Sequence, residues 1–253
     1  MTYYKKNPGI RKEAEIVFLL NGKKFKEITS NNWRFHLSNM FGHIGDDEMI
    51  IARQIEGSQK PDFFIEIAGE RHYVSMKTSD NSCVHQEMID SFTNYLMENS
   101  MSERTIETIL LYHYGDGTTD GTDEKRMEIS ELKSWLKLRI EEANRELNRY
   151  FSFINDFMER ALFNGSHKEY EKADYIYFGD AVFGMMIPKR KVMFHLRHMR
   201  WGYMEALHIG PLTIRPHARY IGTAVTREIS RKKVDVKWPN LSTELAKINS
   251  RYD

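Results

Sequence analysis

Two side chains in the stretch Lys60–Thr78 have the types and spacing of a site that hydrolyses phosphodiesters. Asp62 opens one predicted strand, and Lys77 stands near the end of the next. A carboxylate is a hard oxygen ligand for Mg²⁺, and a lysine beside the metal can hold or deprotonate the attacking water and stabilise developing charge. Ser75 stands two residues before Lys77 and carries no charge, so it cannot replace a second carboxylate.

Strand periodicity favours the convergence of these residues on one face. Side chains in a strand alternate between faces with a period of two, so Ser75 and Lys77 lie together. Asp62 lies on the face opposite the apolar set of its own strand. The link between the two strands, "AGER", is a compact turn, which predicts antiparallel pairing. The apolar sets then form one side of the sheet and leave the polar set on the other.

A replacement carboxylate is present downstream at Glu87. We expect it in the first turns of a helix at about 84–99, just beyond the strand end that carries Lys77. Glu87 is one residue from the buried stripe of that helix, so it flanks the stripe. From there it could lean over the sheet edge toward Asp62.

The remaining hydrophobic patterns predict a mixed sheet flanked by helices, an α/β (α+β) fold. Helices are expected at residues 11–20, about 25–41, about 84–99 and about 130–163, with a short final helix from Ser242. Strands are expected at 49–55, 62–67, 72–78 and 105–114, with further strands within 174–187 and in the basic C-terminal region.

Together these motifs resemble the restriction-endonuclease-like PD-(D/E)XK nuclease superfamily, and type II restriction endonucleases in particular. The similarity is to a variant in which the acid-x-lysine element has become Ser-x-Lys and a downstream helical glutamate is the substitute ligand. The predicted order of helix, three strands, helix and strand up to about residue 115 is similar to the common core of that superfamily. The residues that carry the resemblance are Pro61, Asp62, Ser75, Met76, Lys77 and Glu87.

The resemblance implies a role for each position. Asp62 and Glu87 would bind Mg²⁺, with Mn²⁺ as a substitute, and the backbone carbonyl of Met76 would be a further ligand. Lys77 would be the catalytic lysine, and Ser75 would occupy the degenerate acid position. The substrate would be double-stranded DNA, and a homodimer would allow both strands to be cut.

The roles of four other residues stay open. Glu66 shares a face with Asp62 and is either a reserve ligand or, as we favour, a strand acid that faces solvent. Glu13 and Glu15 lie on the N-terminal helix, where some relatives of this fold place an extra acid. His85 either contacts a phosphate or a water, or only packs and caps its helix.

The charge of the chain is unevenly distributed. The whole chain has a net charge of +1, whereas residues 189–253 hold 14 Lys/Arg and five Asp/Glu. Basic residues interleaved with aromatic residues in this last quarter of the chain favour contact with the backbone of a polyanion. The alternative is a basic face that is simply solvated. The expected DNA-binding residues are Arg197, Arg200, Arg215, Arg219, Arg231, Lys232 and Lys233.

Composition indicates a folded protein with no membrane span. Hydrophobic residues make up 41% of the chain, and no apolar run approaches the roughly 18 residues needed to cross a bilayer. The single cysteine, Cys83, excludes an internal disulfide and a cysteine-based zinc site. A cytoplasmic setting is expected.

These observations predict a nuclease-like catalytic core at 1–125, a helical insertion and possible dimer interface at 126–170, and a sheet-containing basic region at 171–253. The expected function is a Mg²⁺-dependent endodeoxyribonuclease, either type II restriction-like or another defence nuclease. Two alternatives stay open. One is a junction or repair nuclease that recognises DNA shape, and the other is a catalytically inactive nucleic-acid-binding protein.

Overall fold

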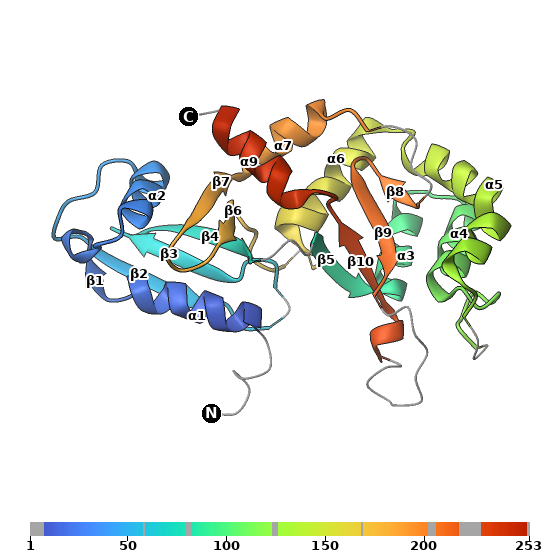
Figure 1. Cartoon of the computed structure of the whole chain (residues 1–253), viewed down its shortest axis with the longest axis horizontal. Helices are drawn as coiled ribbons and strands as arrows, with labels where there is room; N and C mark the ends of the chain where they lie inside the picture. Colours follow the sequence, from blue (N-terminus) through green and yellow to red (C-terminus); the bar gives the residue numbers. More distant parts are fainter. Residues whose placement is uncertain are drawn as a thin grey trace. The chain divides into compact units, whose positions relative to one another are not determined.

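The computed structural model divides the chain into two compact units, each described here by itself (Figure 1). The first unit comprises Met1–Asn81, Leu162–Leu196 and Asn240–Asp253, and the second comprises Ser82–Ala161 and Arg197–Pro239. The structure describes residues 8–57, 59–78, 82–122, 126–167, 169–201, 206–217 and 229–251. The predicted boundaries after residues 125 and 170 do not coincide with those of the units, and the roles predicted for the three segments remain predictions.

The first unit is built on a six-stranded mixed sheet, which confirms the α+β class with a mixed central sheet. The strand order is β1-β2-β3-β4-β6-β7. Every neighbouring pair is antiparallel except β4 and β6, which are parallel. The strands are β1 (Lys23–Lys24), β2 (Met49–Gln54), β3 (Phe63–Ile67), β4 (Glu70–Lys77), β6 (Tyr175–Gly179) and β7 (Gly184–Pro188).

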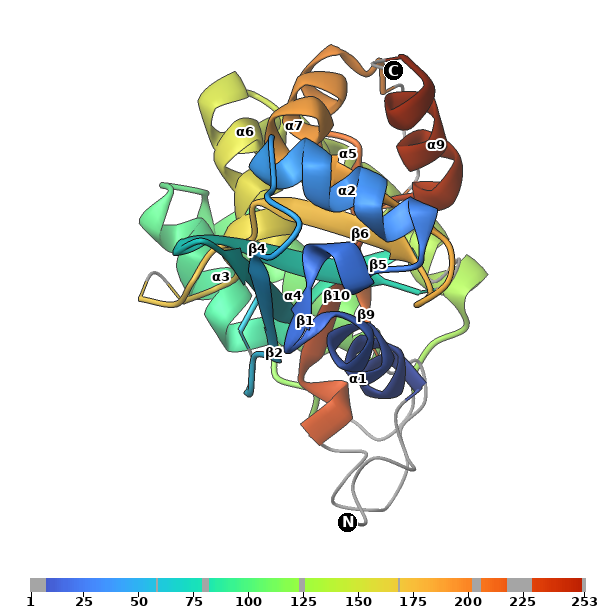
Figure 2. The same cartoon turned by 90° about the vertical axis from the view of Figure 1, so that its left-hand side faces the viewer.

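Two of the helices of this unit cover one face of the sheet. They are α1 (Pro8–Leu20), which runs along β2, and α2 (Asn31–Phe41) (Figures 1 and 2). The single helix expected at about 25–41 is divided, because Ser30 accepts a hydrogen bond from the backbone N–H of Trp33 and caps a new helix. A short 3₁₀ turn, Phe25–Glu27, precedes this cap.

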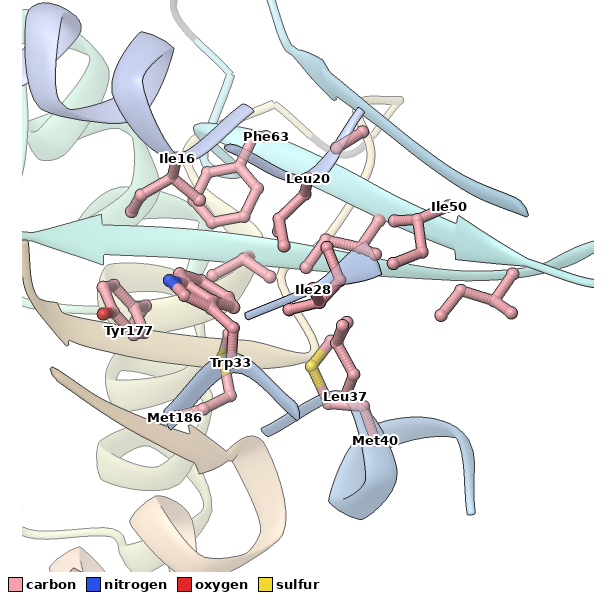
Figure 3. Close-up of a cluster of buried hydrophobic side chains, with 14 of the residues drawn as sticks. Ile16, Leu20, Ile28, Trp33, Leu37, Met40, Ile50, Phe63, Tyr177 and Met186 are labelled. Atoms are coloured by element: carbon pink, nitrogen blue, oxygen red, sulfur yellow. The ribbon is translucent and has the colours of Figure 1, made fainter. Parts of the chain in front are cut away.

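The buried core lies between these helices and the sheet (Figure 3). Cross-strand partners share a face, so the register Phe63–Val74 and Ile65–Ala52 aligns the apolar residues of three strands. Helix α1 contributes Ile16, which is fully buried against this face. The same register leaves the alternate residues of β3 and β4 on the opposite face, as the sequence pattern predicts.

Helix α2 also braces the turn between β6 and β7. Trp33 is fully buried, stacks on Tyr177 at 5.0 Å between ring centroids, and donates its indole N–H to the carbonyl of Ala181 at 2.9 Å. The ring nitrogen Nε2 of His36 lies 2.9 Å from the carbonyl of Gly184. These contacts hold a turn with limited space, since a Cβ on Gly184 would lie 2.4 Å from the Tyr177 ring.

The second unit contains a four-stranded antiparallel sheet in the order β5-β10-β9-β8. Its strands are β5 (Cys83–Met88), β8 (His208–Ile209), β9 (Leu212–Pro216) and β10 (Lys233–Lys237). Its helices are α3 (Ile89–Glu98), α4 (Glu103–Tyr114), α5 (Ile129–Leu147) and α6 (Phe151–Glu159), and a π-helical turn, Arg160–Asn164, follows α6 across the unit boundary.

One predicted element in the second unit is wrong in part and one is wrong throughout. The helix predicted at about 84–99 is present as α3, but it begins only at Ile89. Residues 83–88 form β5 rather than a helix, because they pair with β10, which lies about 150 residues away in the sequence. Residues 105–114 belong to helix α4 rather than to a strand, because Ser102 caps the helix by accepting a hydrogen bond from the N–H of Thr105. The fourth long strand of the first sheet is instead β6, within the predicted strand region 174–187.

The remaining helices of the first unit are α7 (Lys189–His198), which follows β7 directly and continues past the unit boundary, and α9 (Leu241–Arg251), which contacts β7. Among the described residues, no helix is both long enough and apolar enough to cross a membrane.

The bracing by Trp33 gives a stability test. Trp33→Ala should lower the free energy of unfolding by about 3–5 kcal/mol, because it removes a large buried ring and leaves the Ala181 carbonyl without its donor. Phe18→Ala is the matched control, because Phe18 on α1 is 85% exposed, and it should change stability by less than about 0.5 kcal/mol. Urea unfolding followed by circular dichroism measures both. Equal effects of the two substitutions would contradict the packing described.

Candidate active site

The carboxylate of Asp62 is held against strand β4. Asp62 precedes β3, and its backbone N–H donates to the carbonyl of Val74 at 2.8 Å. Its side-chain Oδ2 accepts a hydrogen bond of 2.5 Å from the N–H of Met76. Because the backbone N–H of Met76 holds this carboxylate, Asp62 lies next to the segment that carries Ser75 and Lys77, as the sequence predicts.

Ser75 is fully buried on the same face of the sheet as Asp62. The register Phe63–Val74 continues by one position to place Ser75 across from Asp62. Its hydroxyl oxygen is buried and finds no hydrogen-bond partner within the described part of the chain. A buried hydroxyl without a partner is costly in a folded protein.

A second carboxylate approaches this segment from helix α1. The carboxylate Oε2 of Glu13 lies 3.4 Å from Nε2 of Gln54, which also donates to the carbonyl of Ile10 at 3.1 Å. Burial and the neighbouring negative charge of Asp62 raise the pKa of Glu13 to about 7, against opposing effects of Gln54 and Lys77. These interactions place Glu13, Asp62 and Lys77 close to one another in the first unit.

Helix α1 is tied to the end of β4 by a further contact. The ammonium group of Lys12 donates to the carbonyl of Thr78 at 3.3 Å. This contact stands one residue beyond Lys77, which is half-buried at the carboxyl end of β4. The candidate site is therefore made by the N-terminal half of α1 and the adjoining ends of β2, β3 and β4.

Glu87 lies in the second unit, on strand β5 and not in a helix. Its carboxylate is 3% exposed, forms an ion pair with Arg160, accepts a hydrogen bond from Ser91 Oγ at 2.9 Å, and lies 3.2 Å from Nε2 of His85. Burial opposes ionisation, but His85 and Arg160 outweigh it and lower the pKa of Glu87. Within the described residues, this carboxylate is therefore part of a buried cluster of charged side chains in the second unit. Its role as a metal ligand stays a prediction.

The other acids considered from the sequence are engaged at the surface. Glu66 on β3 pairs with Arg71 at 2.6 Å, and Glu15 on α1 pairs with Arg11 at 2.9 Å. Glu15 is therefore a useful control for Glu13, since it stands on the same helix but is 45% exposed.

The basic residues expected to bind DNA have different surroundings. Arg231 pairs with the fully buried carboxylate of Asp116 at 2.6 Å, so its guanidinium stabilises the fold. Arg197 donates to Oδ1 of Asn155 at 2.6 Å. Arg215 lies on β9 opposite Asp235 in the register of β10. Arg200 and Lys232 are exposed, Lys233 begins β10 and is half-buried, and Arg219 lies outside the described residues. DNA binding by this set stays a prediction.

The oxygen atoms at this site are of the kind that bind a hard divalent cation, with water molecules as the remaining ligands. Mg²⁺ is often bound by one or two carboxylates together with waters and substrate phosphates. Glu13 and Asp62 supply two carboxylates, and the Met76 carbonyl predicted as a ligand stands in the same segment of β4. Among the described residues, no cluster of three or more His, Cys, Asp or Glu could hold a metal ion by itself.

Comparisons with protein-family models and with curated proteins found no match to this chain.

The sequence left the contribution of Glu13 open for a physical reason. Glu13 and Glu15 are both acids on one amphipathic helix, and periodicity alone does not say which of them faces the strand ends. The distinguishing signal is their position relative to the buried residues Ile16 and Leu20, because Glu13 is three residues before Ile16 and lies on the same side of α1. Gln54, at the end of β2, carries no charge and gave no comparable signal.

The raised pKa of Glu13 predicts a pH-dependent stability. An acid whose pKa rises from 4.5 to about 7 on folding destabilises the folded state when ionised, so this penalty is absent at low pH and develops as pH rises from about 4.5 to 7. In a chelating buffer at pH 8, Glu13→Gln should stabilise the fold by about 1 kcal/mol. This is less than the free energy that corresponds to the whole pKa shift, because the carboxylate is partly solvated.

Thermal unfolding at pH 5 and pH 8 measures this effect. The gain in melting temperature of Glu13→Gln should shrink toward pH 5, whereas Glu15→Gln should change it little at either pH. A stability gain that is the same at both pH values would show that ionisation of Glu13 is not its cause.

Proposed function

We propose that this protein is a Mg²⁺-dependent endodeoxyribonuclease whose active site lies in the first unit. The observation that carries the proposal is that the charges of Asp62 and Lys77 both act on Glu13, while the backbone N–H of Met76 holds the Asp62 carboxylate against β4. Two carboxylates and a lysine near one end of a sheet are a suitable arrangement for phosphodiester hydrolysis.

The topology of the first unit supports a restriction-endonuclease-like core. Helix α1, the antiparallel strands β2, β3 and β4, and the parallel strand β6 follow one another in the first unit. The helix expected before the last strand lies in the second unit as α3, and the last strand is far later than predicted. In this proposal residues 82–161 are an insertion between the third and fourth core strands. The type II restriction or other defence role belongs to the same proposal.

The proposal replaces Glu87 with Glu13 as the second acidic ligand. Glu13 shares the first unit with Asp62, whereas the carboxylate of Glu87 is occupied by Arg160 and Ser91 of the second unit. To bind a metal, the carboxylate of Glu87 would have to lose these partners, and breaking a buried ion pair is costly.

When bound, the metal would neutralise phosphate charge and lower the pKa of a bound water. Glu13 and Asp62 would hold it, and the N–H of Met76 keeps the Asp62 carboxylate in place. The ammonium of Lys77 would orient the attacking water and stabilise the negative charge that develops on the phosphate oxygens.

Cleavage assays test these assignments. Purified protein is incubated with mixed plasmid DNA and with branched DNA in the presence of Mg²⁺. Asp62→Asn and Lys77→Met should each lower the cleavage rate by at least about 100-fold, because each removes a group that acts on the reacting phosphate or water. Glu13→Gln should have a comparable effect, and Glu15→Gln should leave the rate within about twofold.

The comparison with Glu87→Gln separates the two ligand assignments. Loss of cleavage in Glu13→Gln together with cleavage by a folded Glu87→Gln variant supports the site described. The reverse result would restore Glu87 as the ligand. A readout without turnover is the rise in melting temperature on adding Ca²⁺ or Mg²⁺, which should disappear in Glu13→Gln and Asp62→Asn.

The product pattern separates the alternatives. Discrete plasmid fragments would indicate sequence-specific cleavage, and selective cutting of branched DNA would indicate a junction or repair nuclease. The neutral Ser75 favours the inactive nucleic-acid-binding alternative, which would be supported by DNA binding without cleavage of any substrate. Cleavage that is unchanged in both Asp62→Asn and Lys77→Met would overturn the proposed site.

A further inference from the structure

The first unit contains a polar groove whose lining includes neither Asp62 nor Lys77. It has a volume of about 660 Å³ and is bordered by α2, the early residues of β4 and β6, the end of β7, the start of α7, and α9. Figure 2 shows α2, α7 and α9 gathered on the same side of β6. Its volume lies within the usual range of small-ligand sites, roughly 300–1,000 Å³.

The groove and the candidate active site lie toward opposite ends of strand β4. His72 lines the groove, and Lys77 stands five residues later at the other end of the strand. At about 3.3 Å per residue, these two positions are roughly 16 Å apart along the strand. The groove is therefore not part of the Asp62 site.

Basic side chains dominate one wall of the groove. Lys189, Arg190 and Lys191 are consecutive, form the first turn of α7, and all line the groove. This first turn contains no acid. Three cations at the N-terminal end of a helix are opposed by its dipole, so an anion in the groove would offset a repulsion that is built into the fold.

The acid that lines the groove is already engaged. Oδ2 of Asp174 accepts a hydrogen bond from the backbone N–H of Tyr73 at 2.9 Å and lies 3.9 Å from Nδ1 of His72. The ammonium of Lys189 lies 5.6 Å from the centroid of the Phe163 ring. Arg190 and Lys191 both line the groove and are the basic pair that a variant should test first.

The groove is also lined by a hydrogen-bond donor and by aromatic rings. Burial and the neighbouring charge of Asp174 raise the pKa of Tyr175, against the opposing charge of Arg190, so its hydroxyl stays a donor near that guanidinium. The ring of Tyr175 packs edge-on against His72, with 5.4 Å between centroids. Phe35 on α2 is 56% exposed and presents an aromatic surface at the groove.

We propose that this groove binds a nucleotide, with its phosphate held by Arg190 and Lys191 and its base placed against Phe35. Guanidinium and ammonium groups are the usual partners of phosphate, and an exposed aromatic ring stacks a base without regard to its identity. The nucleotide is either free or the phosphorylated end of a DNA strand, since both present the same phosphate and base. The proposal does not depend on the nuclease function.

Calorimetric titration of the full chain without divalent metal tests the proposal. The probes are deoxyadenosine 5′-monophosphate, uncharged deoxyadenosine, inorganic phosphate, and a short single-stranded oligonucleotide with and without a 5′-phosphate. We expect the monophosphate to bind and deoxyadenosine not to bind. Binding of the oligonucleotide only when it carries a 5′-phosphate would identify a strand end as a source of the ligand, and binding of the monophosphate alone would identify a free nucleotide.

Matched variants assign the binding to the groove. The double variant Arg190→Glu/Lys191→Glu should weaken binding of the monophosphate by at least about tenfold. It should stay folded, because acids in the first turn of a helix are favoured by the helix dipole. Phe35→Ala should weaken the monophosphate by about threefold or more and leave inorganic phosphate unchanged. Lys23→Glu on β1 is the charge-reversal control in the same unit and should have no effect.

Asp62→Asn separates this proposal from the nuclease site, because it should abolish cleavage and leave nucleotide binding intact. Nucleotide affinity that is unchanged in a folded Arg190→Glu/Lys191→Glu variant would overturn the proposal. So would the absence of binding by every phosphorylated probe, or an equal loss in the Lys23→Glu control.

Discussion

The pairing of β4 on both of its edges is the constraint on which the first unit depends. Its antiparallel register with β3 places Ser75 across from Asp62, and its parallel register with β6 aligns Lys77 with Phe178. A shift of one residue would turn every side chain of β4 to the other face and would exchange the apolar residues with the polar ones. The buried residues Val74 and Met76 oppose that shift, so the same hydrophobic core that stabilises the sheet also positions the polar residues.

Helix α1 completes the site from the helix-covered face. It is held by Ile16 and Leu20 in the core and by the contact of Lys12 with Thr78. This packing leaves Glu13 partly desolvated beside another carboxylate, which is an unfavourable position for an ionised acid. Natural proteins tolerate such a cost at functional sites, and the cost would be relieved by a bound cation.

Charged side chains have two kinds of surroundings in this protein. In the second unit, the charged groups Glu87 and Arg160, and likewise Asp116 and Arg231, are paired inside the fold. Such pairs are destabilising to break, and they specify the packing of the elements that carry them. In the first unit, acids and bases gather at the two ends of β4 beside a buried hydroxyl and a groove. Both proposed ligand sites lie in the first unit.

The sequence by itself determined the strands β2, β3 and β4, the helix α1, and the shared face of Asp62 and Ser75, because these follow from local periodicity and a short connection. It failed for residues 83–88 and 105–114. The first segment became a strand through pairing with β10, a partner distant in the sequence, and the second became a helix through a cap at Ser102 and burial of one helical face. The position of Glu13 beside Asp62 and the separation of Glu87 into another unit were likewise decided by the tertiary structure. Periodicity reports which face a side chain occupies, whereas the identity of its neighbours depends on contacts between segments that are far apart in the chain.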